Sequence, residues 1–426
     1  MSGDFTASIR QVKMYWPIVL ILIMAVIVTF VIIYIKVPSP PLFVYYFGET
    51  NTLSTGFNNS FSPQIASSVN DTYIVKTENV RGSGDISIEK IINNNNNTLP
   101  SPAISIGNAS ANSTNAKVAA AGNNVYVVWS DTNGTKGADP DIFFSSSRDN
   151  ARTFDEPINL SNSNGNSTNP GVAASGNNVY VVWSDTNGAK GEKEDIFFSS
   201  SSDNARTFGE PINLSDNERN STNPNVAASG NNVYVVWADS REETGTPDNV
   251  NLNLKTSADN GMHFGDRKIV KRDVDKETHL PQIAASDKNV YIVLADKDSK
   301  EGKPDNFQVI LRTSTDNGTE FSNKKSLKKD IDSKTHLPHV AAFGNNVYVV
   351  WSDTNGAIGG NGDIFFSSSR DNARTFDEPI NLSNDSTNST KPAISASGSN
   401  VYVFWDDSSS AKNEMEYKQI KLVALE

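Results

Sequence analysis

The feature that most constrains the fold is a segment that recurs seven times along the chain. Its clearest copy reads STNAKVAAAGNNVYVVWSD from Ser113. The copies begin at Phe61, Ser113, Ser167, Ser221, His279, His336 and Thr390. Counted at one equivalent position (Pro63, Ala116, Pro170, Pro224, Pro281, Pro338 and Pro392), they are spaced by 53 to 57 residues, the range in which the blades of β-propellers fall.

Each copy contains four segments with the character of β-strands. VAAAG is followed by the turn residues NN and by VYVVW, which is apolar on both faces; DIFFSSS and EPINLS complete the copy. An Asn-Asn pair tolerates the positive φ angles of a tight hairpin, and an apolar strand is typical of a sheet covered on both sides. The sequence therefore predicts an all-β, seven-bladed β-propeller of four-stranded antiparallel blades. A six-bladed ring and a β-solenoid are the alternatives.

The two ends of the repeat region predict how the ring closes. The last copy ends at YKQIKLVAL, one strand short, while Thr50–Ser54 aligns with the fourth strand of a later copy, Leu53 falling on Leu160. We therefore expect Thr50–Ser54 to pair beside Gln419–Leu425, which would leave no unpaired sheet edge. In the six-bladed alternative, the eroded first copy lies outside the ring.

An uncharged apolar segment, Trp16–Ile35, precedes the repeats and is long enough to cross a bilayer as a helix. It predicts a short cytoplasmic N-terminus (residues 1–14), a transmembrane signal-anchor helix (15–36), a Pro-rich juxtamembrane linker (37–47) and the propeller (48–426). Arg10 and Lys13 precede the helix, which favours a cytoplasmic N-terminus. We thus expect a single-pass protein of the cell membrane with an extracellular propeller; removal of the segment as a signal peptide is the alternative.

Composition narrows the classes of partner. The formal net charge is −12 and the pI about 4.9, which argues against nucleic acid. The chain has no cysteine, so disulfides and thiolate catalysis are excluded. Asn-x-Ser/Thr acceptors lie only after the apolar segment, as expected for an exported glycoprotein. The glycosylation candidates are Asn108, Asn133, Asn166, Asn220, Asn317 and Asn388.

A polar turn that ends in phenylalanine follows the third strand in five copies, as in SRDNARTF at Ser147–Phe154. It resembles the Asp-box (BNR) repeat of the sialidase-like propeller superfamily, in which Asp ties down the turn and the aromatic residue plugs the blade. The matching acids are Asp149, Asp203, Asp259, Asp316 and Asp371. The matching aromatic residues are Phe154, Phe208, Phe264, Phe321 and Phe376. Ala151, Ala205 and Ala373 replace the usual Gly, and we expect the preceding Asn to take the left-handed conformation instead.

The resemblance also raises the question of catalysis. Sialidases use three arginines and a Tyr–Glu pair, and their (Phe/Tyr)-Arg-Ile-Pro motif does not occur in this sequence. A tyrosine occurs once per copy at the same position, as expected for a core residue. We therefore expect a cell-surface binding, adhesion or scaffolding module for a protein or glycan partner, without an evident catalytic residue. The alternative is a sialidase-like exo-glycosidase or another glycan hydrolase.

Acidic residues mark the end of the second strand in every copy, and a second acid begins the third strand in several. The set is Glu78, Asp131, Asp185, Asp239, Asp296, Asp353, Asp407, Asp141, Asp195 and Asp363. One interpretation is an acidic face for Ca²⁺ or a cationic partner, because Ca²⁺ prefers oxygen ligands on loops. The other is that each acid caps its own loop.

Three histidines occur close to the first strands of two neighbouring copies. His279 and His336 occupy the same position, and His339 follows three residues later. First strands line the centre of a propeller, so a metal site built from the three imidazoles is one hypothesis. The other is that the repeated His is a polar loop residue copied by duplication.

Overall fold

The computed structural model describes residues 42–425, apart from 54–59, 69–70, 81–82, 95–96, 108–111, 133–138, 188–192, 242–248, 275–279, 298–306, 332–336, 355–360 and 410–411. Two compact units are distinguished: Met1–Tyr45 with Leu422–Glu426, and Tyr46–Lys421. The predicted membrane helix lies outside the described residues. Among those that are described, no helix has the length and hydropathy to span a bilayer.

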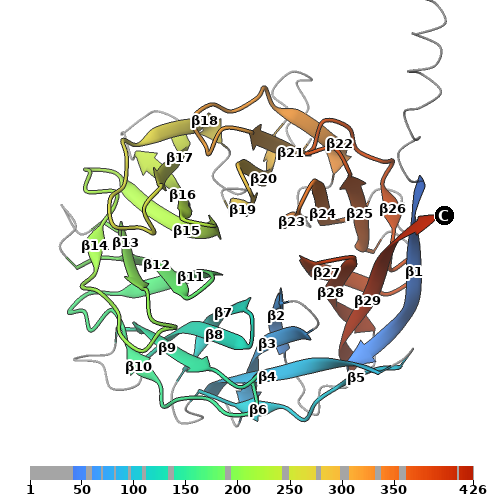
Figure 1. Cartoon of the computed structure of the whole chain (residues 1–426), viewed down its shortest axis with the longest axis horizontal. Coiled ribbons are helices and arrows are strands. Elements are labelled where there is room, and N and C mark those ends of the chain that lie inside the picture. Colours follow the sequence, from blue (N-terminus) through green and yellow to red (C-terminus); the bar gives the residue numbers. More distant parts are fainter. Residues whose placement is uncertain are drawn as a thin grey trace, which may run out of the picture. The chain divides into compact units, whose positions relative to one another are not determined.

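The larger unit is a ring of seven antiparallel sheets (Figure 1). Blade 1 contains β2 (Ser60–Ser68), β3 (Asp71–Val80), β4 (Ser83–Asn94) and β5 (Asn97–Pro100), with β6 (Ile104–Ser105) also on β4. Blade 2 contains β7 (Thr114–Ala121), β8 (Asn124–Asp131), β9 (Asp141–Ser147) and β10 (Ile158–Asn159). Blade 3 contains β11 (Ser167–Ser175), β12 (Asn178–Asp185), β13 (Asp195–Ser201) and β14 (Ile212–Asn213).

The remaining blades follow the same plan. Blade 4 contains β15 (Asn220–Ser229), β16 (Asn232–Arg241), β17 (Asn249–Ser257) and β18 (Lys268–Val274). Blade 5 contains β19 (Gln282–Ser286), β20 (Asn289–Lys297), β21 (Phe307–Ser314) and β22 (Lys325–Ile331). Blade 6 contains β23 (His339–Phe343), β24 (Asn346–Asp353), β25 (Asp363–Ser369) and β26 (Ile380–Asn381). The seven-bladed prediction is confirmed.

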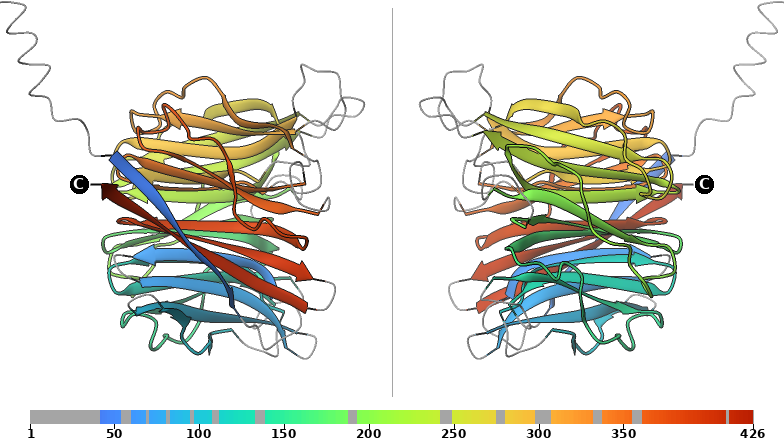
Figure 2. Two further views of the ribbon diagram at one scale, coloured as in Figure 1. Left: turned by 90° about the vertical axis from the view of Figure 1, so that its right-hand side faces the viewer. Right: turned by 90° about the vertical axis from the view of Figure 1, so that its left-hand side faces the viewer.

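Blade 7 combines the two ends of the repeat region. Its strand order is β1-β29-β28-β27, with β27 (Asn388–Ser397), β28 (Asn400–Ser409), β29 (Lys412–Leu425) and β1 (Leu42–Leu53) (Figure 2). Closure by an N-terminal strand is confirmed, but the expected extent and register are wrong. The strand begins at Leu42, inside the segment expected to be a linker, and it is Gly48 that lies against the carbonyl oxygen of Gln419.

The second strand of each blade explains why VYVVW is apolar on both faces. In β8, Val125, Val127 and Trp129 pack with side chains of blade 1. The alternating residues Tyr126 and Val128 pack with side chains of blade 3. Because successive side chains point to opposite faces of a sheet, one strand contributes to two inter-blade cores.

A β-bulge interrupts the innermost strand of blades 1, 2, 3, 4 and 7. In blades 2 to 4 the residue at the bulge is Asn115, Asn169 or Asn223, with φ between 51° and 54°. Asn tolerates this left-handed conformation better than most residues, which explains the repeated STN. The bulge fixes the register at which pairing resumes, which is at Lys117 in blade 2, Gly171 in blade 3 and Asn225 in blade 4.

Candidate functional site

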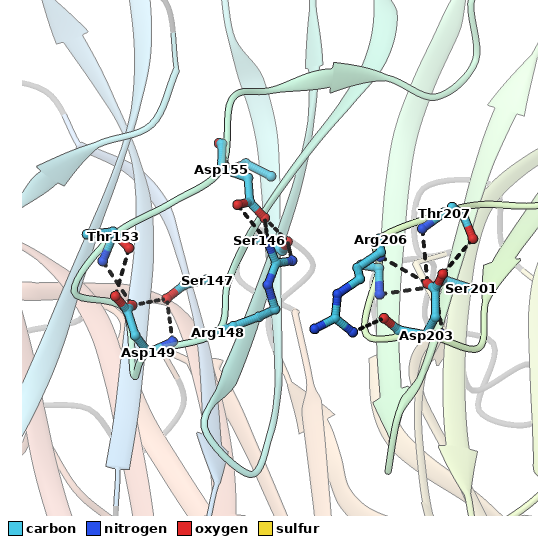
Figure 3. Close-up of polar contacts among 12 residues, drawn as sticks. Ser146, Ser147, Arg148, Asp149, Thr153, Asp155, Ser201, Asp203, Arg206 and Thr207 are labelled. Carbon is cyan, nitrogen blue, oxygen red and sulfur yellow. Dashed lines mark hydrogen bonds and ion pairs between the residues drawn. The ribbon is translucent and has the colours of Figure 1, made fainter.

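The Asp-box turns are built as the resemblance implies (Figure 3). Ser147 Oγ and Asp149 Oδ1 are 2.8 Å apart, and Asp149 Oδ1 accepts hydrogen bonds from the backbone N–H groups of Arg152 and Thr153, each at 3.0 Å. Asp149 Oδ2 accepts a third from Thr153 Oγ1 at 2.7 Å. These donors, the Thr153 N–H first, lower the pKa of Asp149 to about 2. The carboxylate holds the turn closed.

Backbone conformation in these turns differs from the sequence-based expectation. Asn150 does adopt a left-handed φ of 61°, but Ala151 adopts one of 58° as well. Ala205 and Ala373 repeat this, with φ of 60° and 65°. The Asn therefore does not replace the Gly position. Instead the Ala is strained, and its N–H is held by the box serine, as in Ala151 N–H to Ser147 Oγ at 3.0 Å.

The same turns also join neighbouring blades. Asn124 Nδ2 of blade 2 donates to Oδ1 of Asn204, the box asparagine of blade 3, at 2.9 Å. The box phenylalanine Phe208 lies edge-on against Phe144 of blade 2, with ring centroids 4.9 Å apart. An aromatic pair of this geometry adds about 1 kcal/mol to the burial of its rings. Each box is therefore a fastener both within its blade and between blades.

The acids at the end of the second strand are buried, and most of their partners belong to the same blade. Asp185 accepts hydrogen bonds from Ser167 Oγ at 2.8 Å, Trp183 Nε1 at 3.2 Å and the Asn187 N–H at 2.6 Å. Asp131 repeats the contacts to serine and tryptophan, and Asp407 repeats the serine contact. Two others have basic partners: Asp239 bonds Arg267 and Asp296 bonds Lys271, each at 2.9 Å. Asp353 is fully buried, and the side chain of Glu78 lies outside the described residues.

The acids that begin the third strand fasten the outermost strand. Asp141 accepts hydrogen bonds from Asn159 Nδ2 at 2.7 Å and Ser161 Oγ at 2.8 Å. Asp195 and Asp363 make the equivalent bonds to Asn and Ser of their own blades. This geometry favours the second interpretation, in which each acid caps its own loop. Ca²⁺ binding stays a prediction. Within the described residues, the carboxylates of Asp385, Asp407 and Glu416 lie within 4.8 Å of one another.

Replacing Asp185 distinguishes the two interpretations. We expect Asp185→Asn to lower the free energy of unfolding by about 2 kcal/mol, because an amide NH₂ would meet buried donors in place of a carboxylate oxygen. The loss should be equal in millimolar Ca²⁺ and in chelator, measured by urea unfolding. Asp266→Asn, at an exposed position, is the control. A loss confined to the Ca²⁺ arm would instead assign the acid to a cation site.

Two of the three histidines of the proposed metal site, His279 and His336, lie outside the described residues, so that hypothesis stays a prediction. His339 is the first residue of β23 and pairs with Val350 of β24. Enclosure by the blades and, to a smaller extent, the nearby Lys117 ammonium lower its pKa to about 3. The imidazole is therefore neutral at pH 7, but the same ammonium opposes a metal cation beside it.

His339 belongs to a ring of side chains that repeat-based reasoning missed. One register position of the innermost strand, opposite the fourth residue of VYVV or its equivalent, holds a different residue in almost every blade. The ring is Gln64, Lys117, Gly171, Asn225, Gln282, His339 and Ala393. Its neighbours in sequence repeat closely, so this variation was the available signal.

Two contacts show that residues of the ring meet across blades. Lys117 Nζ donates to Gln64 Oε1 at 3.0 Å, and Asn225 Nδ2 donates to Gln282 Oε1 at 2.9 Å. Enclosure lowers the pKa of Lys117 to about 8. Gly171 and Ala393 are buried and have no long side chain, so they add no polar group to the ring. The ring, called the channel ring below, is the candidate functional site.

The glycosylation candidates occupy three environments. Asn108 and Asn133 lie outside the described residues. Asn317 is a box asparagine, whose Oδ1 is 3.4 Å from Tyr234 Oη. Asn220 accepts a hydrogen bond from the Glu194 N–H of the preceding blade at 2.9 Å. Asn388 does the same with Gly362, and Asn166 is half-buried at the equivalent position, so use of these sites stays a prediction.

Several tyrosines and arginines, the residue types that a sialidase uses, have structural contacts in this chain. The repeated tyrosines, such as Tyr126 and Tyr180, are fully buried in the inter-blade cores. Arg148 forms an ion pair with Asp155 at 2.7 Å on the box turn, and Arg370 forms the equivalent pair with Asp377 at 3.3 Å. These contacts give the residues structural roles.

Comparisons with known proteins agree on the fold. No protein-family model and no curated protein matches the chain. A protein of unknown function from Dyadobacter fermentans has a TM-score of 0.50 at 14% identity, over 74% of this chain and 96% of its own. The phage phi92 endosialidase has a TM-score of 0.51 at 10% identity, over 92% and 72%. Trypanosoma rangeli sialidase has a TM-score of 0.47 at 10% identity, over 77% and 56%. The match to the endosialidase, together with the seven blades and the Asp-box turns, shows that the chain has a sialidase-like β-propeller fold.

Proposed function

We propose that the chain is a membrane-anchored extracellular propeller that acts as a cell-surface binding, adhesion or scaffolding module. The observation that supports this is that its polar residues fall into two groups, one that repeats from blade to blade and one that varies. Those that repeat from blade to blade are used as fasteners, as Asp149 and Asp185 are, whereas those of the channel ring vary. A rigid closed frame with one variable ring suits recognition, in which specificity comes from a few side chains.

A glycan hydrolase is the alternative function, and the fold is the observation that supports it. Glycosidases need two carboxyl groups on either side of the bond that is cleaved, one of them with a raised pKa. Burial does raise the pKa of Asp239, but this carboxylate is bonded to Ser221, Trp237 and Arg267. The binding function is therefore favoured. Release of free sugar from sialosides or common glycosides by the purified chain would reverse this order.

Topology is tested with epitope tags at the two ends of the full chain. We expect a C-terminal tag to be labelled by antibody on intact cells and an N-terminal tag only after permeabilisation, because Arg10 and Lys13 precede the apolar segment. External protease should release the propeller and leave the N-terminal tag in the membrane fraction. Labelling of the N-terminal tag alone on intact cells would contradict the proposed orientation, and secretion of the chain without the tag would indicate cleavage.

A further inference from the structure

We propose that the channel ring binds a small carboxylate monoanion, with Lys117 as its charge partner. Lys117 extends from β7 at the register position that faces the centre of the ring. Its one hydrogen bond within the described part of the chain is to the neutral amide of Gln64, at 3.0 Å. No carboxylate of the described residues forms an ion pair with it. Lys117 is half-buried, and a half-buried cation without a counter-charge is stabilised when a ligand supplies one.

The surrounding strands contribute no compensating acid at this level. The ring residue is Gln64 on the neighbouring β2, Gly171 on β11, Ala393 on β27 and His339 on β23. Lys117 and His339 are close enough for the ammonium to lower the pKa of the imidazole. Between their strands lie β27 and β2, and the Ala393 side chain ends at Cβ. The centre therefore presents two nitrogen groups, with Ala393 and the amide of Gln64 on the two strands between them.

The charge state favours a monoanion over a dianion. The pKa of Lys117 is lowered to about 8, so this side chain is mostly protonated at pH 7, whereas His339, with a pKa of about 3, is neutral. The ring thus carries one positive charge and amide or imidazole N–H donors. A carboxylate matches this set, because one oxygen can accept from the ammonium and the other from a neutral donor. Sulfate or phosphate would introduce an extra, unpaired negative charge.

Removal of the Lys117 ammonium should have an unusual effect on stability. In the absence of a ligand, Lys117→Met should leave the full chain as stable as the wild type or more stable, because an uncompensated charge is replaced by an apolar chain of similar length. The wild type should be stabilised by acetate and the variant should not. Lys288→Met, in the exposed β19–β20 turn, is the matched control, because its lysine lies far from the ring register.

Thermal unfolding of the full chain in detergent tests the proposal, with sodium acetate replacing sodium chloride at constant ionic strength. We expect acetate to raise the midpoint of the wild type and of Lys288→Met by about 1–2 °C, and to leave Lys117→Met unchanged. NMR titration of ¹³C-methylated lysines should show the pKa of Lys117 rising in acetate. Equal shifts in wild type and Lys117→Met, an equal response to sulfate, or an unchanged Lys117 titration would each overturn the proposal. Failure of the surface topology would leave it intact.

Discussion

Deletion of Leu42–Leu53 is expected to be the most damaging change to this chain, because it removes the strand that closes the ring. Without β1, the outer edge of β29 is unpaired, and its backbone N–H and C=O groups are exposed. The strand also carries Phe47, whose ring lies edge-on to Phe366 of blade 6 at 6.2 Å. Loss of several hydrogen bonds and one aromatic side chain corresponds to on the order of 5 kcal/mol.

Two substitutions in β1 show how much of this loss of stability comes from a single side chain. Phe47→Ala should cost about 2–3 kcal/mol, since it removes the contact with blade 6 and keeps the strand. Tyr46→Ala should change stability by less than about 0.5 kcal/mol, because Tyr46 points outward with 67% of its surface exposed. Urea unfolding gives the free energies, and light scattering on warming reports edge-to-edge aggregation. A deletion variant as stable as Tyr46→Ala would show that the ring closes without β1.

The sequence was sufficient to predict the architecture because each blade repeats a complete physical unit. VYVVW had to be covered on both sides, and its residues do contact both neighbouring blades. The N-terminal strand could be assigned because one blade lacked its fourth strand. Its register could not, because β1 has no copy of the turn that fixes the register of the other outer strands, and Gly48 rather than Thr50–Ser54 came to lie against Gln419.

The roles of the acids were ambiguous for a different reason. Asp185 and its partner Ser167 are 18 residues apart, on strands that pair only after the blade folds. From the sequence, Asp185 ends a strand and precedes an Asn-rich loop, which is equally compatible with a loop cap and a cation ligand. Burial distinguishes the loop cap from the cation ligand, since a carboxylate that accepts hydrogen bonds from the protein on both oxygens has less capacity to bind a metal.

The channel ring was overlooked because repeats direct attention to what is constant. Lys117 and His339 stand where their neighbouring copies have Gly171 or Gln282, and such differences resemble the drift of a duplicated chain. The shared register of the seven inner strands and the contacts of Lys117 with Gln64 and of Asn225 with Gln282 bring these residues together, and neither is visible in the sequence. The Asp-box contacts between blades make this variation tolerable, because they stabilise the ring at positions away from its centre.

The repeated tryptophans offer an internal comparison that measures one such fastener. Trp183 and Trp351 lie in identical VYVVWSD segments, are at most 1% exposed and stack on Phe197 and Phe365 with centroids 6.1 Å apart. They pack against different neighbouring blades, and they differ in the hydrogen bond of the indole. Trp183 Nε1 donates to Asp185 at 3.2 Å, whereas Trp351 Nε1 has no acceptor within the described part of the chain. Packing and hydrogen bonding can therefore be separated.

Trp183→Ala should lower the free energy of unfolding by about 4 kcal/mol, because it leaves a large cavity between blades 2 and 3. Trp183→Phe keeps an aromatic ring but leaves the buried Asp185 carboxylate with one donor fewer. Trp351→Phe makes the same change in ring size without removing a hydrogen bond. We expect Trp183→Phe to cost about 1.5 kcal/mol more than Trp351→Phe, the usual contribution of a hydrogen bond to a charged group. Equal costs in urea unfolding would show that Asp185 is held by its serine and backbone donors alone, and that the indole serves only to pack the blades.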